Sequence, residues 1–188
     1  IRYDKSMESY EATRQKYKPD HIAVLFIAES QPPAASVPSS RQFYRSDQIR
    51  KGDRLFVNTI KALYPKASDL TEQAIEEQKD TWLRQFQADE YYMIEALDES
   101  LVHEVTKKER QEKIRQNLPA LIKKVRGLAS ADTKLILIKS NVFDVAAVPL
   151  RQAGFTVLNT ELVDYPGQFN QRAYREKLAD LLGTSGTH

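Results

Sequence analysis

The chain has 188 residues, of which 41% are hydrophobic and 29% are charged, and its formal net charge is +2. This balance is typical of a globular protein and excludes a disordered chain, and the length suits one well-buried domain. The small net charge does not indicate a nucleic-acid-binding protein, although it permits a local basic patch. Cysteine is absent. Disulfides and thiolate metal sites are therefore excluded, which fits a cytoplasmic location.

The two ends of the chain and its hydropathy lead to three further expectations. No apolar run approaches the roughly 20 residues that span a bilayer, and no signal segment leads the chain, so we expect no membrane partner. The sequence begins at Ile1 rather than Met, so we expect a missing segment upstream. We expect residues 1–182 to form a single domain and 183–188 to be a disordered or vector-derived tail.

An apolar run at residues 22–28 is predicted to be the central strand of a parallel sheet, covered on both faces. Glu29 and Ser30 follow it directly, and a proline-rich loop then leads to Phe43 and Tyr44. Ligands of open α/β sheets bind beyond the carboxyl ends of the strands, so these polar residues are the first candidate site. An ordinary connection between a strand and a helix explains them equally well.

Helical patterns lie before and after this strand. Residues 6–16 predict a short helix at the sheet edge that ends before Pro19. Asp47 is predicted to cap a helix that ends at Pro65, and another helix is predicted from Thr71. The apolar residues expected to face the core from these helices are Leu55, Phe56, Ile60, Leu63, Ile75, Trp82, Leu83 and Phe86.

Residues 91–97 predict the second strand, because an aromatic and apolar run is bounded there by charges. Glu95 interrupts the run, so it either lies near the exposed end of the strand or belongs to a site. Residues 107–128 predict a long amphipathic helix, in which Pro119 indicates a kink or two abutting helices. The basic residues of this helix are interpreted as a solvated face, with DNA binding as the alternative.

The last third of the chain continues the alternation of strands and helices. Residues 134–138 and 155–158 predict two more strands, and Ser140 or Asn141 is predicted to cap a helix over 142–152. Gly154 supplies the turn after that helix. A final helix is predicted to bury Tyr174, Leu178, Leu181 and Leu182. The sequence therefore predicts an α/β fold: a three-layer α/β/α sandwich with a central four-stranded parallel sheet.

Common catalytic and cofactor motifs are absent. The sequence contains no G-x-G-x-x-G, no phosphate-binding G-x-x-x-x-G-K-[ST] and no G-x-S-x-G. His21 and His103 are far apart, so we expect no metal and no cofactor. A small-molecule hydrolase built on Ser30 would need His103 as its base, because no other histidine is a candidate.

Several short sequences follow one another in a recognisable order. AESQPP ends the first strand, a loop leads to an aromatic pair, KLILIKSN opens a helix, and a short fourth strand leads to a proline turn. Over residues 21–182 this order resembles the uracil-DNA glycosylase-like superfamily. The resemblance implies hydrolysis of the N-glycosidic bond of a deaminated or modified base, flipped out of DNA, without metal or cofactor.

The first motif of that family is a Gly-x-x-Pro stretch that positions the attacking water. Ala28, Glu29, Ser30 and Pro32 occupy its place here, and Gln31 is an apparent extra residue. Family variants carry a carboxylate or an amide in this motif. The resemblance therefore implies that Glu29 is a general base that orients water, and that Ser30 hydrogen-bonds the water.

Two further family positions concern the base itself. Phe43 or Tyr44 corresponds to the aromatic residue that stacks on the flipped base. Glu95 corresponds to a polar residue of the second strand, an asparagine in several members, that reads the base edge. An ionised carboxylate cannot donate to a carbonyl oxygen, so the resemblance does not imply the usual recognition of uracil.

The second family motif, usually His-Pro-Ser, corresponds here to Tyr165, Pro166, Gly167 and Gln168. The neutral phenol of Tyr165 stabilises a departing anion less well than a histidine. A non-catalytic member that binds a nucleotide, a nucleic acid or a protein in the same crevice is therefore the alternative. Five basic residues near the proline-rich loop either hold DNA phosphates or form a solvated helix face. They are Arg41, Arg45, Arg50, Lys51 and Arg54.

Overall fold

The computed structural model describes residues 10–31, 42–46, 52–101 and 105–184. Four parallel strands form one sheet in the order β2-β1-β3-β4. The strands are β1 (Val24–Ala28), β2 (Tyr91–Glu95), β3 (Lys134–Leu137) and β4 (Thr156–Val157). All four predicted strands are confirmed, each a little shorter than expected. Every residue of β1 is buried, and β1 lies between two other strands, as the apolar run predicted.

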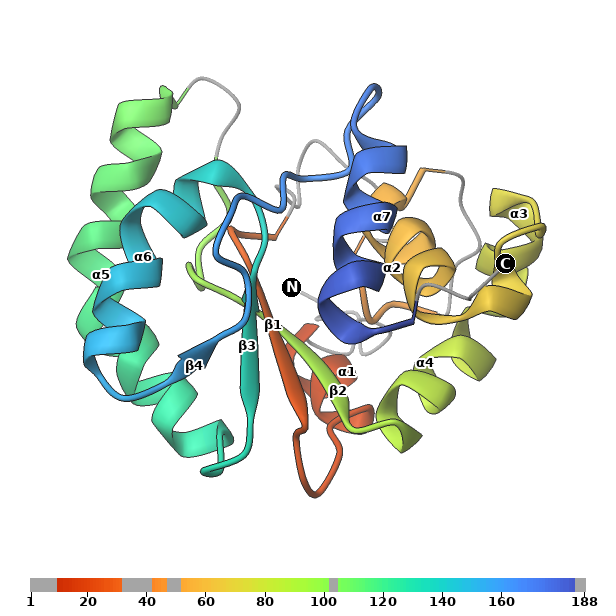
Figure 1. Cartoon of the computed structure of the whole chain (residues 1–188), viewed down its shortest axis with the longest axis horizontal. Coiled ribbons are helices and arrows are strands. Elements are labelled where there is room, and N and C mark those ends of the chain that lie inside the picture. The colour runs from red at the N-terminus through yellow and green to blue at the C-terminus, as the bar shows by residue number, and fades with distance from the viewer. Residues whose placement is uncertain (1–9, 32–41, 47–51, 102–104, 185–188) are drawn as a thin grey trace, which may run out of the picture.

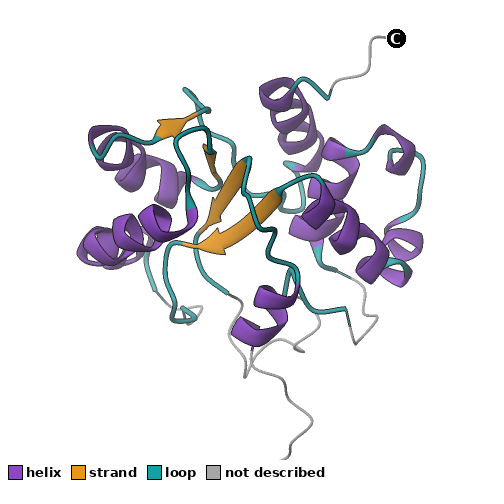
Figure 2. Ribbon diagram, turned by 90° about the horizontal axis from the view of Figure 1, so that it is seen from below, coloured by secondary structure: helices purple, strands orange, loops and turns teal. Residues whose placement is uncertain are grey.

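Helices cover both faces of the sheet. They are α1 (Tyr10–Lys16), α2 (Arg54–Leu63), α3 (Glu72–Glu77), α4 (Lys79–Ala88), α5 (Lys107–Leu128), α6 (Ser140–Gln152) and α7 (Gln171–Leu182), and a short 3-10 helix spans Pro65–Ala67. Figure 1 shows α5 and α6 on one side of the sheet and α2, α4 and α7 on the other. In Figure 2 the strands run between these two groups of helices. The α/β fold is therefore confirmed, and its layers are consistent with an α/β/α sandwich.

The helices between β1 and β2 differ from the prediction in their ends. The cap of α2 is Asp53 and not Asp47, since the Asp53 carboxylate accepts a hydrogen bond of 3.1 Å from the backbone N of Phe56. Asp47 itself lies outside the described residues. The helix predicted from Thr71 is two helices, α3 and α4, which meet at Gln78. The capping role of Thr71 is confirmed by its bond from the backbone N of Ala74.

The helices after β2 bring two corrections. α5 continues through Pro119, so the alternative of two abutting helices is wrong. Pro119 is exposed, and water can therefore bond the carbonyl that the proline leaves free. α6 begins at Ser140 and no side chain caps it, so the predicted caps Ser140 and Asn141 are wrong. Gly154 is confirmed as the turn residue, with φ of 94°.

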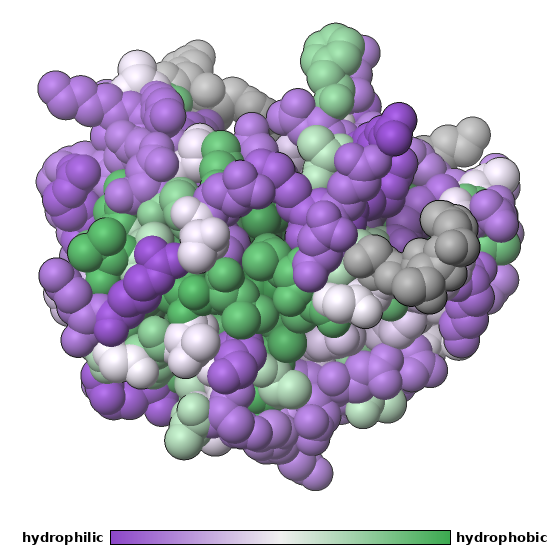
Figure 3. Space-filling model, in the orientation of Figure 1, coloured by the Kyte–Doolittle hydropathy of each residue, from purple (hydrophilic) through white to green (hydrophobic). Residues whose placement is uncertain are grey.

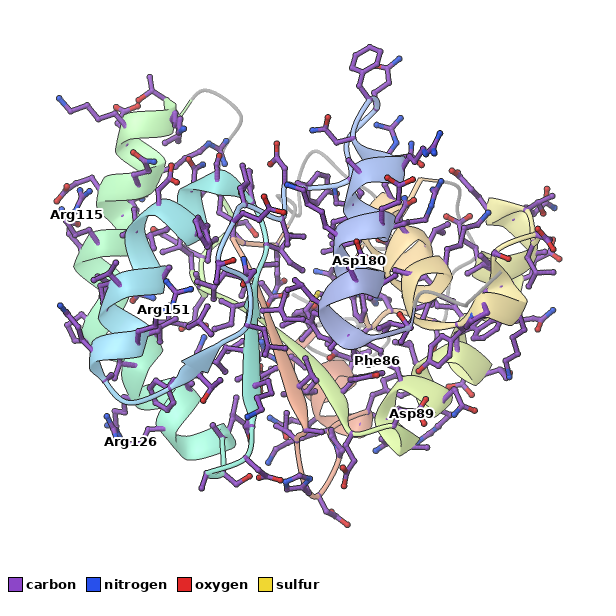
Figure 4. The ribbon with its side chains drawn as sticks, in the orientation of Figure 1. Phe86, Asp89, Arg115, Arg126, Arg151 and Asp180 are labelled. Carbon is purple, nitrogen blue, oxygen red and sulfur yellow. The ribbon has the colours of Figure 1, made fainter. Side chains whose placement is uncertain are left out.

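The core fills the space between the sheet and both helix layers. The residues predicted to face it from α2, α3 and α4 are buried, apart from the partly buried Leu55, and Phe86 stacks on Phe26 of β1 (Figure 4). Tyr174 and Leu178 of α7 are buried as predicted, and Leu181 and Leu182 are partly buried. Figure 3 shows polar residues over most of the periphery and apolar ones near the middle of that face.

Two further observations concern the end of the chain and membranes. Gly183 ends α7 in the left-handed conformation, and the Thr184 hydroxyl donates a hydrogen bond of 2.9 Å to the carbonyl of Ala62. These two residues of the expected tail thus belong to the folded part, and residues 185–188 lie outside the described ranges.

None of the helices in the described ranges has the length and apolarity that a membrane span requires.

Candidate functional site

The strand order determines where a ligand site is expected. β1 is followed in the chain by β2 on one side, whereas β3 is followed by β4 on the other side. The connections therefore diverge at the carboxyl ends of β1 and β3, which is where open α/β sheets bind ligands. Glu29, Ser30 and Gln31 directly follow β1, so the predicted candidates do lie at this switch point.

Successive residues at the end of β1 serve opposite faces of the sheet, as side chains along a strand do. Ala28 and Ser30 line a cavity on the side of α2. Glu29 instead contacts side chains of α5 and of the α6 amino end. The residues predicted to share one crevice are therefore divided into two groups, here named the cavity and the ionic cluster.

The cavity has a volume of about 60 Å³ and brings together five of the predicted site residues from four parts of the chain. These residues are Ser30, Gln31, Phe43, Glu95 and Tyr165. Ala28 of the first family motif also lines the cavity, and the lining residues that the sequence analysis did not assign to a site are Tyr10, Gln42, Asp53, Leu55 and Met93. The convergence of distant segments is what the resemblance led us to expect of a site.

Two glutamine amides border the cavity. Gln42 Nε2 donates a hydrogen bond of 3.2 Å to Gln31 Oε1. Gln42 Oε1 is a buried oxygen without a hydrogen-bond partner in the described part of the chain. The Gln42 amide thus uses its nitrogen as a donor to Gln31, and its oxygen remains an acceptor without a partner among the residues described.

Glu95 is buried and is held by two side chains of α1. Its carboxylate accepts hydrogen bonds of 2.8 Å from Arg14 Nη1 and of 2.9 Å from the Tyr10 hydroxyl. Burial raises the pKa of Glu95, and the neighbouring Arg14 guanidinium opposes that rise. Burial and the negative charge of Glu95 both raise the pKa of Tyr10. Tyr10 therefore remains a hydrogen-bond donor in the cavity wall.

A buried cation supports the opposite wall of the cavity. Lys79 Nζ donates hydrogen bonds of 2.8 Å to Asp53 Oδ2 and of 2.9 Å to the backbone carbonyl of Gln42. Glu76 Oε1 accepts from the backbone N of Gly52 and of Asp53. The burial of Lys79 was not predicted, because a lysine in a helical pattern is usually interpreted as solvent-exposed. It connects the cap of α2 to the segment that carries Phe43.

The two aromatic candidates have different environments. Phe43 lines the cavity and packs edge-on against Phe56, with ring centroids 5.4 Å apart. Tyr44 is fully buried, and its phenolic oxygen accepts a hydrogen bond of 2.6 Å from the backbone N of Met93. Of the two residues assigned to base stacking, only Phe43 therefore borders the cavity.

The loop that replaces the second family motif carries a residue that the sequence analysis did not select. Tyr165 lines the cavity and is 40% exposed, Pro166 is buried, and Gln168 is exposed. The backbone N of Gly167 bonds to the carbonyl of Tyr165 at 2.8 Å, which tightens the loop. Phe169, which was not selected, is 89% exposed on the same loop.

The ionic cluster consists of Glu29, Arg110, Lys139 and Asn141. Glu29 Oε2 pairs with Arg110 Nη1 at 3.2 Å and with Lys139 Nζ, and Glu29 Oε1 accepts a hydrogen bond of 2.6 Å from Asn141 Nδ2. Only 5% of Glu29 is exposed. Its three partners were missed, because Asn141 was interpreted as a helix cap, Arg110 was interpreted as part of a solvated helix face, and Lys139 was not considered.

Lys139 has an unusual backbone. Its φ is 80° and its ψ is 142°, a conformation that costs a residue other than glycine about 1–3 kcal/mol. The backbone N of Lys139 donates to the carbonyl of Val163 at 2.8 Å, and its own carbonyl accepts from Phe143 at 3.0 Å. These bonds, together with the contact to Glu29, hold the strained residue at the switch point.

The candidates for phosphate contacts are only partly described. Arg45 is 5% exposed, so it is not available to a DNA phosphate in this structure. Arg54 is exposed at the start of α2. Pro32, Arg41, Arg50 and Lys51 lie outside the described residues, as does His103, the base required by the Ser30 hydrolase alternative.

The chain was compared with protein-family models, with curated proteins and with solved structures, and none of these comparisons found a match. Its function is therefore inferred from the residues and their geometry.

Across the described ranges, no group of three or more His, Asp or Glu residues lies close enough to hold a metal ion. The cavity offers amide, hydroxyl and carboxyl groups beside three aromatic rings, those of Tyr10, Phe43 and Tyr165. Such groups hydrogen-bond and stack on a planar polar molecule. The ionic cluster offers a carboxylate whose oxygens already bind three donors.

Proposed function

We propose that the cavity receives a nucleobase flipped out of DNA. We propose further that the protein is a DNA glycosylase of the uracil-DNA glycosylase-like type, which hydrolyses the N-glycosidic bond of a deaminated or modified base. The observation that supports this proposal is the convergence on one cavity of Ser30, Gln31, Phe43, Glu95 and Tyr165. The resemblance had assigned Ser30 to the attacking water and Phe43, Glu95 and Tyr165 to the base, and it had placed Gln31 in the first motif as an extra residue.

The small size of the cavity restricts how a base can enter it. Its volume of about 60 Å³ is well below the roughly 300–1,000 Å³ of sites that enclose small molecules. A base therefore enters only when the cavity widens. Tyr165, which is partly exposed on its loop, is the lining residue that can move away at the lowest cost in buried contacts.

Gln31 is better placed than Glu29 to position the attacking water. Its amide lines the cavity, whereas Glu29 is held on the other face by Lys139, Arg110 and Asn141. In the proposed reaction the water oxygen bonds to the sugar C1′ while the C1′–N bond breaks and its electron pair leaves with the base. The water proton then passes to the base, and the Tyr165 phenol donates a hydrogen bond to it. Glu29 acts as an anchor of the loop.

The exposed Phe169 supports contact with DNA. Extrusion of a base leaves a gap in the stack, and apolar side chains that insert between base steps stabilise such distorted DNA. Phe169 is four residues from Tyr165 and is 89% exposed. We infer that it enters the duplex beside the flipped nucleotide.

A non-catalytic binding protein is the second candidate. The specific observation in its favour is that both oxygens of Glu29, the carboxylate assigned to water activation, already bind protein donors. The histidine of the second motif is also replaced by Tyr165. Such a protein would bind the base in the same cavity and release nothing.

The test is release of free base from duplex oligonucleotides that carry uracil, hypoxanthine or xanthine. We expect Gln31→Ala to slow release by about 100-fold, the loss typical of a reacting group that is no longer held in its productive position. Gln73→Ala, which removes an exposed glutamine of α3, is the matched control and should leave release unchanged.

The other outcomes separate the alternatives. Release that depends on Glu29 and not on Gln31, in variants that remain folded, would assign the water to Glu29. No release, combined with DNA binding that weakens in Phe169→Ala, would support the non-catalytic protein. Neither release nor binding by the folded protein would refute both.

A further inference from the structure

A second and larger depression lies on the side of α5, away from the cavity. α1 and α5 form its walls and the side chains of Tyr92 and Ile94 from β2 form its floor. Its volume is about 650 Å³, which falls inside the roughly 300–1,000 Å³ range of small-molecule sites. This depression is named the α1/α5 groove below.

Two buried polar atoms in the lining of the groove have no hydrogen-bond partner among the described residues. They are Arg14 Nε and the Tyr92 hydroxyl oxygen, on side chains of residues that are 8% and 1% exposed. Buried polar groups are nearly always paired, and an unpaired one destabilises the fold. Both groups can donate a hydrogen bond, and an acceptor oxygen within reach of either would satisfy it.

Part of the remaining lining is apolar or small, and the rest is polar or charged: Glu11, Gln15, Asp98, Lys123 and Lys124. Ile94 and Leu128 supply apolar surface, and Ala120 and Gly127 lie seven residues apart on the same face of α5. A Cβ added at Gly127 would meet no atom within 4 Å. A glycine inside a helix costs about 1 kcal/mol relative to alanine, and here it leaves the groove open.

The charges around the groove leave one cation unpaired. Lys124 pairs with Asp98, and Arg14 pairs with Glu11 and Glu95. Lys123 is exposed and has no ion-pair partner in the part of the chain that the structure describes. A ligand with one negative charge would therefore find a cation at the rim and donors at the floor.

We propose that the α1/α5 groove binds a small amphipathic carboxylate. The carboxylate oxygens accept from Arg14 Nε and from the Tyr92 hydroxyl, while the apolar body lies against Ile94, Leu128 and Gly127. Lys123 stabilises the remaining charge. This site is separate from the cavity and does not depend on the proposed glycosylase activity.

An ion pair connects the groove to the cavity. Arg14 lines the groove, and its Nη1 holds Glu95, which lines the cavity. A ligand that binds Arg14 should therefore change the position or the charge interactions of the Glu95 carboxylate, which borders the base-binding cavity. Occupancy of the groove should change the affinity of the cavity for its own ligand, and the reverse change should be equal.

The experiment uses 2-naphthoate as the probe and 2-naphthalenemethanol as its uncharged counterpart, with binding measured by calorimetry on the full chain. We expect 2-naphthoate to bind at least about tenfold more tightly than the alcohol, the gain typical of a charged hydrogen bond. Gly127→Leu fills the groove without a clash and should weaken binding at least about tenfold. Gln116→Leu adds the same side chain to an exposed position of the same helix outside the groove and should leave binding unchanged.

Tyr92→Phe gives a second readout that a purely structural hydroxyl would not produce. Removal of an unpartnered buried hydroxyl should leave the Tm of the free protein unchanged or higher, while the affinity for 2-naphthoate falls about fivefold. The proposal is overturned if 2-naphthoate does not bind, if the alcohol binds equally well, or if Gly127→Leu and Gln116→Leu have the same effect.

Discussion

The cavity and the ionic cluster begin at neighbouring residues after β1, yet they lie on opposite faces of the sheet. Ser30 and Gln31 line a cavity that six separate parts of the chain enclose, and Glu29 contacts two cations and an amide. The first region has hydrogen-bonding groups beside aromatic rings, whereas in the second both oxygens of Glu29 already bind protein donors. Adjacent residues at the end of a strand can therefore have different roles: Ser30 lines a cavity, whereas Glu29 anchors the chain through its ion pairs.

The largest effect is expected in the wall of the cavity. Lys79→Met leaves Asp53 buried without its cation and removes the bond to the Gln42 carbonyl. Both side chains of the ion pair are at most 6% exposed, so we expect a loss of about 3–5 kcal/mol in the free energy of unfolding. Urea denaturation measures it, with the exposed Lys108→Met as the control. A loss as small as that of the control would mean that Lys79 does not support the wall.

The ionic cluster should respond less strongly. Glu29→Ala leaves Arg110 and Lys139 without their carboxylate, but these side chains are 18% and 32% exposed, so water offsets part of the cost. We expect a loss of about 2–3 kcal/mol in urea denaturation, near the lower end for a broken buried pair. Glu29→Gln should lose less, since its amide oxygen can still accept from Asn141. Unchanged stability in Glu29→Ala together with complete loss of base release would assign Glu29 a chemical role instead of an anchoring one.

The finding that Phe43 borders the cavity and Tyr44 does not can be tested by removing the hydroxyl oxygen of Tyr44. Tyr44→Phe leaves the backbone N–H of Met93 without its acceptor, which should destabilise the protein by about 1–3 kcal/mol. Hydrogen exchange at the Met93 amide should accelerate. DNA binding by the folded variant should be unaffected, and a selective loss of binding would return Tyr44 to the list of base contacts.

The smallest effect concerns the pH dependence of stability. Because burial raises the pKa of Glu95, the folded protein binds its proton more tightly than the unfolded chain does. Protonated Glu95 therefore stabilises the fold at low pH, and this contribution is lost as the pH rises through the raised pKa. Glu95→Gln should flatten that decline in urea denaturation measured across pH. Glu76, whose pKa burial also raises, remains and should leave a residual slope. An identical slope in Glu95→Gln and the unmodified protein would contradict the assignment.

Much of the fold follows from local sequence patterns. The four strands, the span of α5 and the buried faces of α2, α4 and α7 were predictable because apolar periodicity reports burial directly. The errors are at Asp47, Ser140 and Asn141, where several polar residues could cap a helix and only the three-dimensional surroundings select one. Helix ends are the part of a sequence pattern with the least information.

The site was predictable only in part, for a physical reason. Residues that reach the cavity from separate segments could be selected because each follows a strand or belongs to a motif. The partners of buried charges could not, since Arg14 lies 81 residues from Glu95 and Arg110 lies 81 residues from Glu29. No local pattern distinguishes these cations from the solvated ones on the same helices.

The position of β1 in the sheet also has a consequence during synthesis. β1 leaves the ribosome before both of its neighbours, β2 and β3, which come much later in the chain. At about 5–20 residues per second, the roughly 60 residues that separate β1 from β2 take several seconds to appear. Throughout that time the apolar segment VLFIA lacks its partners. The nascent chain should therefore be a substrate for chaperones that bind extended apolar segments, and a protein with weakened β1 should fail mainly by aggregation on or near the ribosome.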